Sequence, residues 1–211
     1  MITLLIARHG NTFDPGDVIL RVGKQTDFPL SNSGREQAKK LGVFLSEKYP
    51  KIDLVLVSSL RRTQETASIA LPENAFEINP IFDEIDYGID DGKPESQVIE
   101  RIGEQALKQW EEHAVPPSGW KVEPEKIMHD WQDFAKKCVE QYPSGATILV
   151  VTSNGIARFA PSILNKVSNQ HLTPSLSLKM KTGAISSFQF TKKQGWQLEY
   201  WNFLPTGLAN V

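Results

Sequence analysis

The sequence has little cysteine and no excess of charge of one sign. Cys138 is the one cysteine in 211 residues, which excludes an intramolecular disulfide framework and a zinc site built on several cysteines. The formal net charge is −2, so no overall positive field attracts nucleic acid or an anionic membrane surface. We therefore expect neither as a partner. A few local Arg and Lys side chains must bind any anionic small molecule.

Long apolar runs are also absent. No stretch approaches the roughly 20 apolar residues that span a bilayer. The first run, residues 2–7, is too short for a signal peptide and has no basic region before it. We expect a cytoplasmic protein. The 40% hydrophobic and 23% charged residues suit one folded domain rather than a disordered chain.

Three short apolar runs predict an α/β fold. Residues 2–7, 54–57 and 147–151 are apolar except for Thr3 and Thr147, which is typical of buried parallel strands. Helical spacing follows the first two runs and also covers residues 127–139. The first of these helices has a capping-box pattern from Ser33 to Glu36. We expect a mainly parallel sheet with helices on both faces.

The remaining segments complete a single domain over residues 1–211. Residues 76–79 suggest a weak strand, and residues 184–190 and 196–201 alternate in the manner of a hairpin. Apolar residues at helical spacing run from Val98 to Trp110, and Pro161 should shorten the helix that follows residues 147–151. Residues 87–130, which contain Gly and Pro breaks, are predicted to form a small helical lid insertion. The tryptophans in this insertion can pack either on substrate or on the core.

Polar residues directly follow each of the three apolar runs. They are Arg8-His9-Gly10, residues 58–62, and Ser153-Asn154-Gly155. Because the carboxyl ends of parallel strands share one edge of a sheet, these groups should converge there, where α/β proteins place ligands. A neutral histidine at this edge can attack phosphorus while guanidinium groups bind the phosphoryl oxygens.

The ordered set of motifs resembles the histidine phosphatase superfamily, the phosphoglycerate mutase-like proteins. The resemblance covers nearly the whole chain. The segments that carry it are Arg8-His9-Gly10-Asn11-Thr12, Arg21-Val22-Gly23, Asp27-Phe28-Pro29-Leu30, Gly34 with Gln37-Ala38, Ser58-Ser59-Leu60-Arg61-Arg62-Thr63, and Glu84-Ile85-Asp86-Tyr87-Gly88.

This resemblance implies a division of roles. His9 is the nucleophile that accepts the phosphoryl group, and Arg8 and Arg62 bind phosphate. Glu84 is the proton donor to the leaving alkoxide and then the base for water. The resemblance implies that Asn11, Thr12 and Arg21 contact phosphate or substrate, and it implies no metal or cofactor. We expect the carboxylates near Glu84 to raise its pKa.

One position departs from the family pattern. Family members normally have a second histidine five residues before an arginine, and counting back from Arg158 reaches Ser153. The four histidines of the chain all stand elsewhere: they are His9, His113, His129 and His171. Ser153 or Asn154 can still donate a neutral hydrogen bond to phosphate. Loss of one preorganised donor costs about 10² to 10³ in rate.

Three functions remain open at this point. The first is a phosphatase that hydrolyses a phosphate monoester through a phosphohistidine, with activity reduced by the missing histidine. The second is a catalytically weak protein that binds phosphate esters on the same scaffold. The third is a phosphoglycerate-type mutase. All three predict a small phosphorylated molecule as the partner, and the sequence names neither that molecule nor the oligomeric state.

Overall fold

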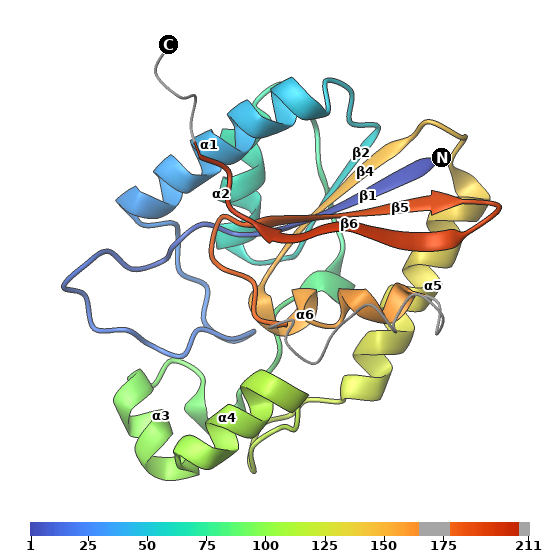
Figure 1. Cartoon of the computed structure of the whole chain (residues 1–211). Helices are drawn as coiled ribbons and strands as arrows, with labels where there is room; N and C mark the ends of the chain where they lie inside the picture. The colour runs from blue at the N-terminus through green and yellow to red at the C-terminus, as the bar shows by residue number, and fades with distance from the viewer. Residues whose placement is uncertain (165–177, 207–211) are drawn as a thin grey trace.

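A six-stranded sheet forms the centre of the protein (Figure 1). The computed structural model describes residues 1–164 and 178–206. The strands are β1 (Ile2–Arg8), β2 (Leu54–Val57), β3 (Glu77–Ile78), β4 (Thr147–Thr152), β5 (Ile185–Thr191) and β6 (Gly195–Phe203). Their order is β3-β2-β4-β1-β5-β6; the first four are mutually parallel, and β5 and β6 form an antiparallel hairpin. The predicted single α/β domain with a mostly parallel sheet is confirmed.

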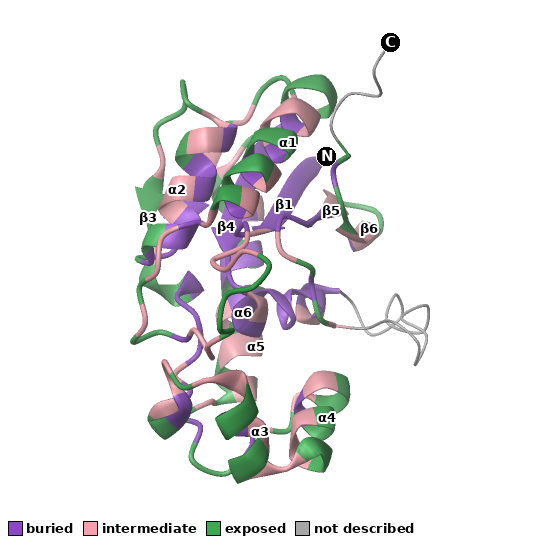
Figure 2. Ribbon diagram, turned by 90° about the vertical axis from the view of Figure 1, so that its left-hand side faces the viewer, coloured by how far each residue is buried: buried purple, intermediate pink, exposed green. Residues whose placement is uncertain are grey.

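Helices cover both faces of the sheet. Alternate residues of a strand point to opposite faces, so Leu5 and Leu149 join one apolar cluster while Leu4 and Ile148 join another. The helices α1 (Asn32–Lys48) and α2 (Arg61–Ala70) supply the first cluster. The helices α5 (Pro124–Gln141) and α6 (Asn154–Ala157) supply the second (Figures 1 and 2).

The start of α1 differs from the sequence prediction. Its N-cap is Ser31, whose hydroxyl accepts a hydrogen bond from the Gly34 backbone N–H at 3.2 Å. The predicted cap, Ser33, lies two residues later and instead accepts a hydrogen bond from the Asn11 side chain at 3.1 Å. A contact with the loop after β1 thus replaces the local capping pattern.

The helices α3 (Glu95–Ile102) and α4 (Glu104–His113) form a separate group in the lower part of Figures 1 and 2, whereas residues 124–130 belong to α5. A 3₁₀ turn (Gly88–Asp90) precedes α3. The single helical pattern predicted across this stretch is divided at Gly103, whose φ of 80° ends α3. Trp110 and Trp120 are both buried in the larger apolar cluster.

The chain after β4 is short and irregular. As Pro161 predicted, α6 has four residues and a 3₁₀ turn (Ala160–Ile163) follows it; another 3₁₀ turn (Pro80–Phe82) follows β3. Among the helices that the structure describes, none is long and apolar enough to cross a membrane.

Candidate active site

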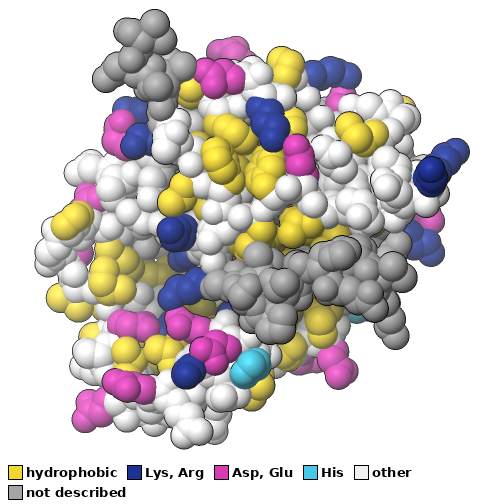
Figure 3. Space-filling view, in the orientation of Figure 1, with side chains coloured by type: hydrophobic (Ala, Val, Ile, Leu, Met, Phe, Trp, Pro, Cys, Tyr) yellow, Lys and Arg dark blue, Asp and Glu magenta, His cyan; other side chains and the backbone are white. Residues whose placement is uncertain are grey.

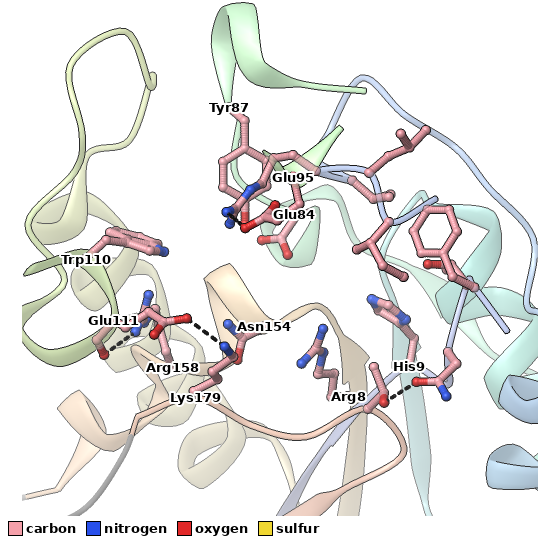
Figure 4. Close-up of a pocket in the computed structure, with 18 of the residues that line it drawn as sticks. Arg8, His9, Glu84, Tyr87, Glu95, Trp110, Glu111, Asn154, Arg158 and Lys179 are labelled. Atoms are coloured by element: carbon pink, nitrogen blue, oxygen red, sulfur yellow. Dashed lines mark hydrogen bonds and ion pairs between the residues drawn. The ribbon is translucent and has the colours of Figure 1, made fainter. Parts of the chain in front are cut away.

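A cavity of about 470 Å³ lies where β1 and β4 end, and α3 and α4 form its opposite wall (Figure 4). Residues from the strand ends that line it include Arg8, His9 and Asn154, and residues from the helical segment include Glu95 and Trp110. Figure 3 shows basic and acidic side chains along the hollow between the body of the molecule and the α3–α4 segment. Of the polar groups predicted to converge at the carboxyl edge of the sheet, Arg8, His9 and Asn154 line this cavity, whereas residues 58–62 and Ser153 do not.

His9 directly follows β1 and is 6% exposed. Its backbone N–H donates to the Thr152 carbonyl at 3.0 Å, which ties the loop to the end of β4. The ring Nδ1 lies 2.7 Å from the Gly10 carbonyl. Because a carbonyl only accepts, Nδ1 carries the proton and Nε2 is left with a free lone pair. Burial, helped by the charges of Arg62 and Arg8, lowers the pKa of His9 well below its usual value, so the ring is neutral.

Two glycines allow the loop after β1 to pack against the start of α1. A Cβ on Gly10 would lie 2.3 Å from the Gly34 carbonyl oxygen, and a Cβ on Gly34 would lie 2.0 Å from the Asn11 oxygen. Side chains cannot occupy either position without moving backbone. Gly10 and Gly34 therefore allow the loop that carries His9 to approach the start of α1 closely.

Arg8 and Arg62 are the two predicted phosphate-binding cations. Arg8 donates from Nη1 to the Met180 carbonyl at 2.5 Å. Arg62, in the first turn of α2, is fully buried and donates to the carbonyls of Thr26 (2.9 Å) and Gly23 (3.2 Å). In the part of the chain that the structure describes, neither Nε has a hydrogen-bond partner. Arg62 is not among the lining residues, but its charge adds to burial in lowering the pKa of Arg8 and of His9.

Glu84 lines the cavity and is 5% exposed. Its two carboxylate oxygens accept hydrogen bonds from the backbone N–H groups of Ile85 (2.9 Å) and Gly155 (3.2 Å). Burial raises the pKa of Glu84, against the opposing charges of Arg62 and Arg8. A Cβ on Gly155 would lie 2.1 Å from Glu84 Oε1, so this approach requires glycine.

The sequence analysis attributed the raised pKa of Glu84 to the carboxylates near it, and this attribution is wrong. The neighbouring carboxylates do not raise the pKa of Glu84, because other groups bind them. Asp83 accepts from the Ser59 backbone N–H at 2.7 Å and lies 3.8 Å from Lys24. Asp90 accepts two hydrogen bonds from the Arg101 guanidinium. The pKa of Glu84 therefore depends on its own burial.

Ser153 and Asn154 differ in their access to the cavity. Ser153 is the fully buried N-cap residue of α6, and its Oγ has no hydrogen-bond partner among the described residues. Asn154 lines the cavity, whereas Ser153 does not. The Oδ1 of Asn154 accepts a hydrogen bond from the Met180 backbone N–H at 2.8 Å.

Asn11, Thr12 and Arg21 also line the cavity. The Asn11 side chain donates to Ser33 and accepts from Thr182, so it holds the loop in place. Arg21 pairs with Glu95. All three candidates thus lie at the site, and two of them already have protein partners.

Several lining residues were not predicted from the sequence. Arg158 is 1% exposed, lies 4.3 Å from the centre of the Trp110 ring and donates to the Glu111 carbonyl at 2.7 Å. Lys179 pairs with the Glu111 carboxylate at 2.6 Å. The spacing from Ser153 marks Arg158 in the sequence, but no motif marks Trp110, Glu111 or Lys179. Among the described residues, no group of three or more His, Cys, Asp or Glu side chains could hold a metal ion.

The chain is similar to several known proteins in sequence and in structure. A 2,3-bisphosphoglycerate-dependent phosphoglycerate mutase of Parvibaculum lavamentivorans is 27% identical over 201 residues, which cover 91% of this chain and 92% of the relative. A mycobacterial glucosyl-3-phosphoglycerate phosphatase, solved with VO3, has a TM-score of 0.77 at 22% identity and covers 95% of this chain and 98% of its own. The alpha-ribazole phosphatase of Shigella flexneri has a TM-score of 0.68 at 22% identity, with coverage of 99% and 100%. These two structures show a shared fold.

The family assignment itself rests on sequence. The family profile described as histidine phosphatase superfamily (branch 1) matches residues 4–204, which is nearly the whole chain. Proteins of this superfamily are phosphatases and mutases that act through a phosphohistidine and bind phosphorylated small molecules. The chain belongs to the histidine phosphatase superfamily, branch 1, as its motifs predicted.

Proposed function

We propose that the protein is a phosphatase that hydrolyses a small phosphate monoester through a phosphohistidine on His9. The observation that carries this proposal is the state of His9 itself. Its ring is buried and neutral, Nδ1 is tied to the Gly10 carbonyl, and Nε2 has a free lone pair. Besides burial, the charges of Arg62, which is fully buried, and of Arg8, which is half-buried, lower its pKa. A neutral nucleophile beside fixed positive charge suits attack on a phosphate dianion.

Two steps complete the reaction. In the first, the electron pair of His9 Nε2 forms a bond to phosphorus, the bond from phosphorus to the ester oxygen breaks, and the leaving oxygen takes a proton from Glu84. In the second, Glu84 takes a proton from water as the water oxygen attacks the phosphohistidine, which releases phosphate and restores His9. The raised pKa of Glu84 suits a group that gives and then regains a proton.

Binding and selection use the rest of the cavity. Arg8, Arg62 and Thr12 bind the phosphoryl group, while Asn11 keeps the loop in position and Arg21 contacts the rest of the substrate. Residues 87–130 act as a lid that selects the leaving group, because Glu95, Trp110 and Glu111 of this segment line the wall opposite the strand ends. A small phosphorylated molecule is the partner.

A hydrolysis assay tests this function. The parent protein should release the alcohol and inorganic phosphate from an aryl phosphate. His9→Ala should lower the rate by at least about 10³-fold because it removes the nucleophile. Lys136→Ala, which changes an exposed residue of α5 outside residues 87–130, is the control and should keep the parent rate. Hydrolysis that survives in His9→Ala would contradict the proposal.

Ser153 favours one alternative, a weak or inactive protein that binds phosphate esters. Its hydroxyl does not line the cavity, so the cation that a second histidine would provide is absent from that position. Phosphate binding without any His9-dependent hydrolysis would establish the alternative. A mutase, the activity named for the relative from Parvibaculum, would instead convert one phosphoglycerate isomer into the other.

A further inference from the structure

We propose that Asn154 is a catalytic residue whose side-chain Nδ2–H group donates to an oxygen of the transferring phosphoryl group. It thereby takes the place that a second histidine would fill. This inference rests on the proposed function, and it selects one of the two neutral donors that the sequence left open. Four features of the structure support it: the orientation of the amide, its link to Arg8, its access to the cavity and the position of Ser153.

The orientation of the Asn154 amide is fixed by its partner. Oδ1 accepts from the Met180 backbone N–H at 2.8 Å. A backbone N–H can only donate, so the oxygen end of the amide must face Met180 and the NH₂ end must point away from it. Nδ2 has no hydrogen-bond partner in the described part of the chain, although Asn154 lines the cavity. Its donors are therefore available to a ligand.

Met180 also holds Arg8, the phosphate-binding cation. Its carbonyl accepts from Arg8 Nη1 at 2.5 Å, while its N–H orients Asn154. One backbone residue thus sets both the guanidinium and the amide. Met180 is fully buried, and Arg8 and Asn154 come from neighbouring parallel strand ends, with Arg8 opposite Thr152 in the register. Donors fixed in this manner need little reorganisation when charge develops on the phosphoryl oxygens.

Figure 4 shows Asn154 between Arg158 and Arg8, below Glu84. A phosphoryl group at His9 and Arg8, with its ester oxygen near Glu84, would therefore lie within the space that Asn154 borders. The position suits a donor to the phosphoryl group as it moves between the ester oxygen and His9 Nε2.

Ser153 lacks this access. Its Oγ is fully buried, is absent from the cavity lining and has no partner among the described residues. A serine side chain ends one atom beyond Cβ, whereas an imidazole from the same position reaches several ångströms further. Replacing histidine by serine at this position leaves the hydroxyl beneath the cavity wall, and the next residue provides the donor instead.

Kinetics and ligand binding together test this role. Asn154→Ala should lower kcat for an aryl phosphate by about 10²-fold, the usual cost of one preorganised donor. Ser153→Ala should cost far less. Vanadate resembles the five-coordinate phosphoryl group in transit, so Asn154→Ala should weaken vanadate binding by a larger factor than phosphate binding. Asn154→Asp, which keeps the shape and loses the donor, should weaken vanadate at least as much.

Asn202 provides a matched control for a merely structural effect. Its Oδ1 accepts from the Lys181 backbone N–H at 2.7 Å, so Asn202 holds the same segment as Asn154 without lining the cavity. Asn202→Ala should keep the parent ratio of vanadate to phosphate affinity.

The outcomes separate this inference from the proposed function. Hydrolysis that depends on His9 but is unchanged in Asn154→Ala would overturn the role of Asn154 and leave the phosphatase intact. An equal loss of kcat in Asn202→Ala would also overturn it. If the parent protein shows no hydrolysis, the phosphatase fails, and the vanadate-to-phosphate ratio of the folded Asn154→Ala variant alone decides for or against the donor.

Discussion

The two walls of the cavity differ in how their charged side chains are buried and paired. On the wall formed by the strand ends and the loop that carries Glu84, His9 and Glu84 are buried, and backbone groups supply their hydrogen bonds. On the wall formed by the helical segment, the carboxylates of Glu95 and Glu111 each pair with a cation from elsewhere in the chain. The first wall has fixed, shifted ionisable groups of the kind that perform chemistry. The second has ion pairs that a ligand can rearrange.

The strengths of the interactions on the two walls also differ. The Lys179–Glu111 pair has side chains 53% and 40% exposed, and such surface pairs contribute about 0–1 kcal/mol. A bound leaving group can displace this pair at little cost. Removing a partner from a buried, desolvated group costs considerably more. Substitutions at the strand ends should therefore change the chemical step, and those in the helical segment should change the choice of substrate.

Glu84→Gln gives the largest expected effect within this comparison. An amide cannot donate the proton that an alkoxide needs, so kcat for alkyl phosphates should fall by about 10²- to 10⁴-fold. Aryl phosphates with good leaving groups should lose much less. The measurement is a series of esters with leaving groups of increasing pKa. Equal losses across the series would contradict the role of Glu84 as the acid.

Ser153→His restores the side chain that the family pattern predicts. A cationic donor should raise kcat by about tenfold or more, because it adds positive charge next to the transferring group. Phosphate affinity should change less than kcat. Thermal unfolding of the variant checks that the buried position accepts the ring. A folded variant with an intact phosphate site and no gain in kcat would show that Ser153 is not the vacant catalytic position.

Gly155→Ala should act through Glu84. The added Cβ would lie 2.1 Å from Glu84 Oε1, so the carboxylate must move and lose a backbone hydrogen bond. We expect a smaller version of the Glu84→Gln pattern, with alkyl esters slowed more than aryl esters. In the double variant Gly155→Ala with Glu84→Gln, the alanine should add little, because groups that act as a unit are not additive. Additive losses would show that Gly155→Ala acts on a group other than Glu84.

Glu111→Gln tests the opposite wall. It removes the ion pair with Lys179 and leaves the backbone carbonyl that binds Arg158. The kcat for a small aryl phosphate should stay within about fivefold of the parent value, in line with the strength of an exposed pair. The KM values for larger esters should change relative to one another. A loss of kcat as large as that of Glu84→Gln would remove the distinction between the two walls.

Stability against pH gives the smallest effect. Burial raises the folded-state pKa of Glu84 above its usual value of 4.5. Below that value the carboxyl is protonated in both folded and unfolded states, and above it the folded protein resists ionisation and loses stability as pH rises. Glu84→Gln should therefore stabilise the protein more at about pH 7.5 than at about pH 4. Denaturant unfolding at both pH values measures this; a gain that is equal or larger at acid pH would contradict the raised pKa.

The sequence predicted the first wall far better than the second. Arg8, His9, Glu84 and Asn154 stand at strand ends or in ordered motifs, so a short continuous apolar run and a short polar motif suffice to place them. The contributions of the second wall depend on how α3 and α4 pack against distant segments. Lys179 and Glu111 are 68 residues apart in the chain. No local pattern contains that contact.

Two further features of the site depend on the folded structure and cannot be predicted from the sequence. Met180 orients Arg8 through its carbonyl and Asn154 through its N–H, and every residue except proline possesses both groups. The acidity of Glu84 depends on its burial, not on the carboxylates that precede and follow it in the chain. Motifs thus predict which side chains meet, and the fold determines how they are oriented and charged.

Trapping the intermediate tests the central claim most directly. The parent protein is mixed with an aryl phosphate, quenched in alkali, where phosphohistidine persists, and digested for mass spectrometry. The account predicts one phosphoryl group on the peptide that contains His9, formed and lost at rates compatible with turnover, and none in His9→Ala. A phosphoryl group on another residue, or hydrolysis with no phosphoryl group on His9 at any time, would contradict it.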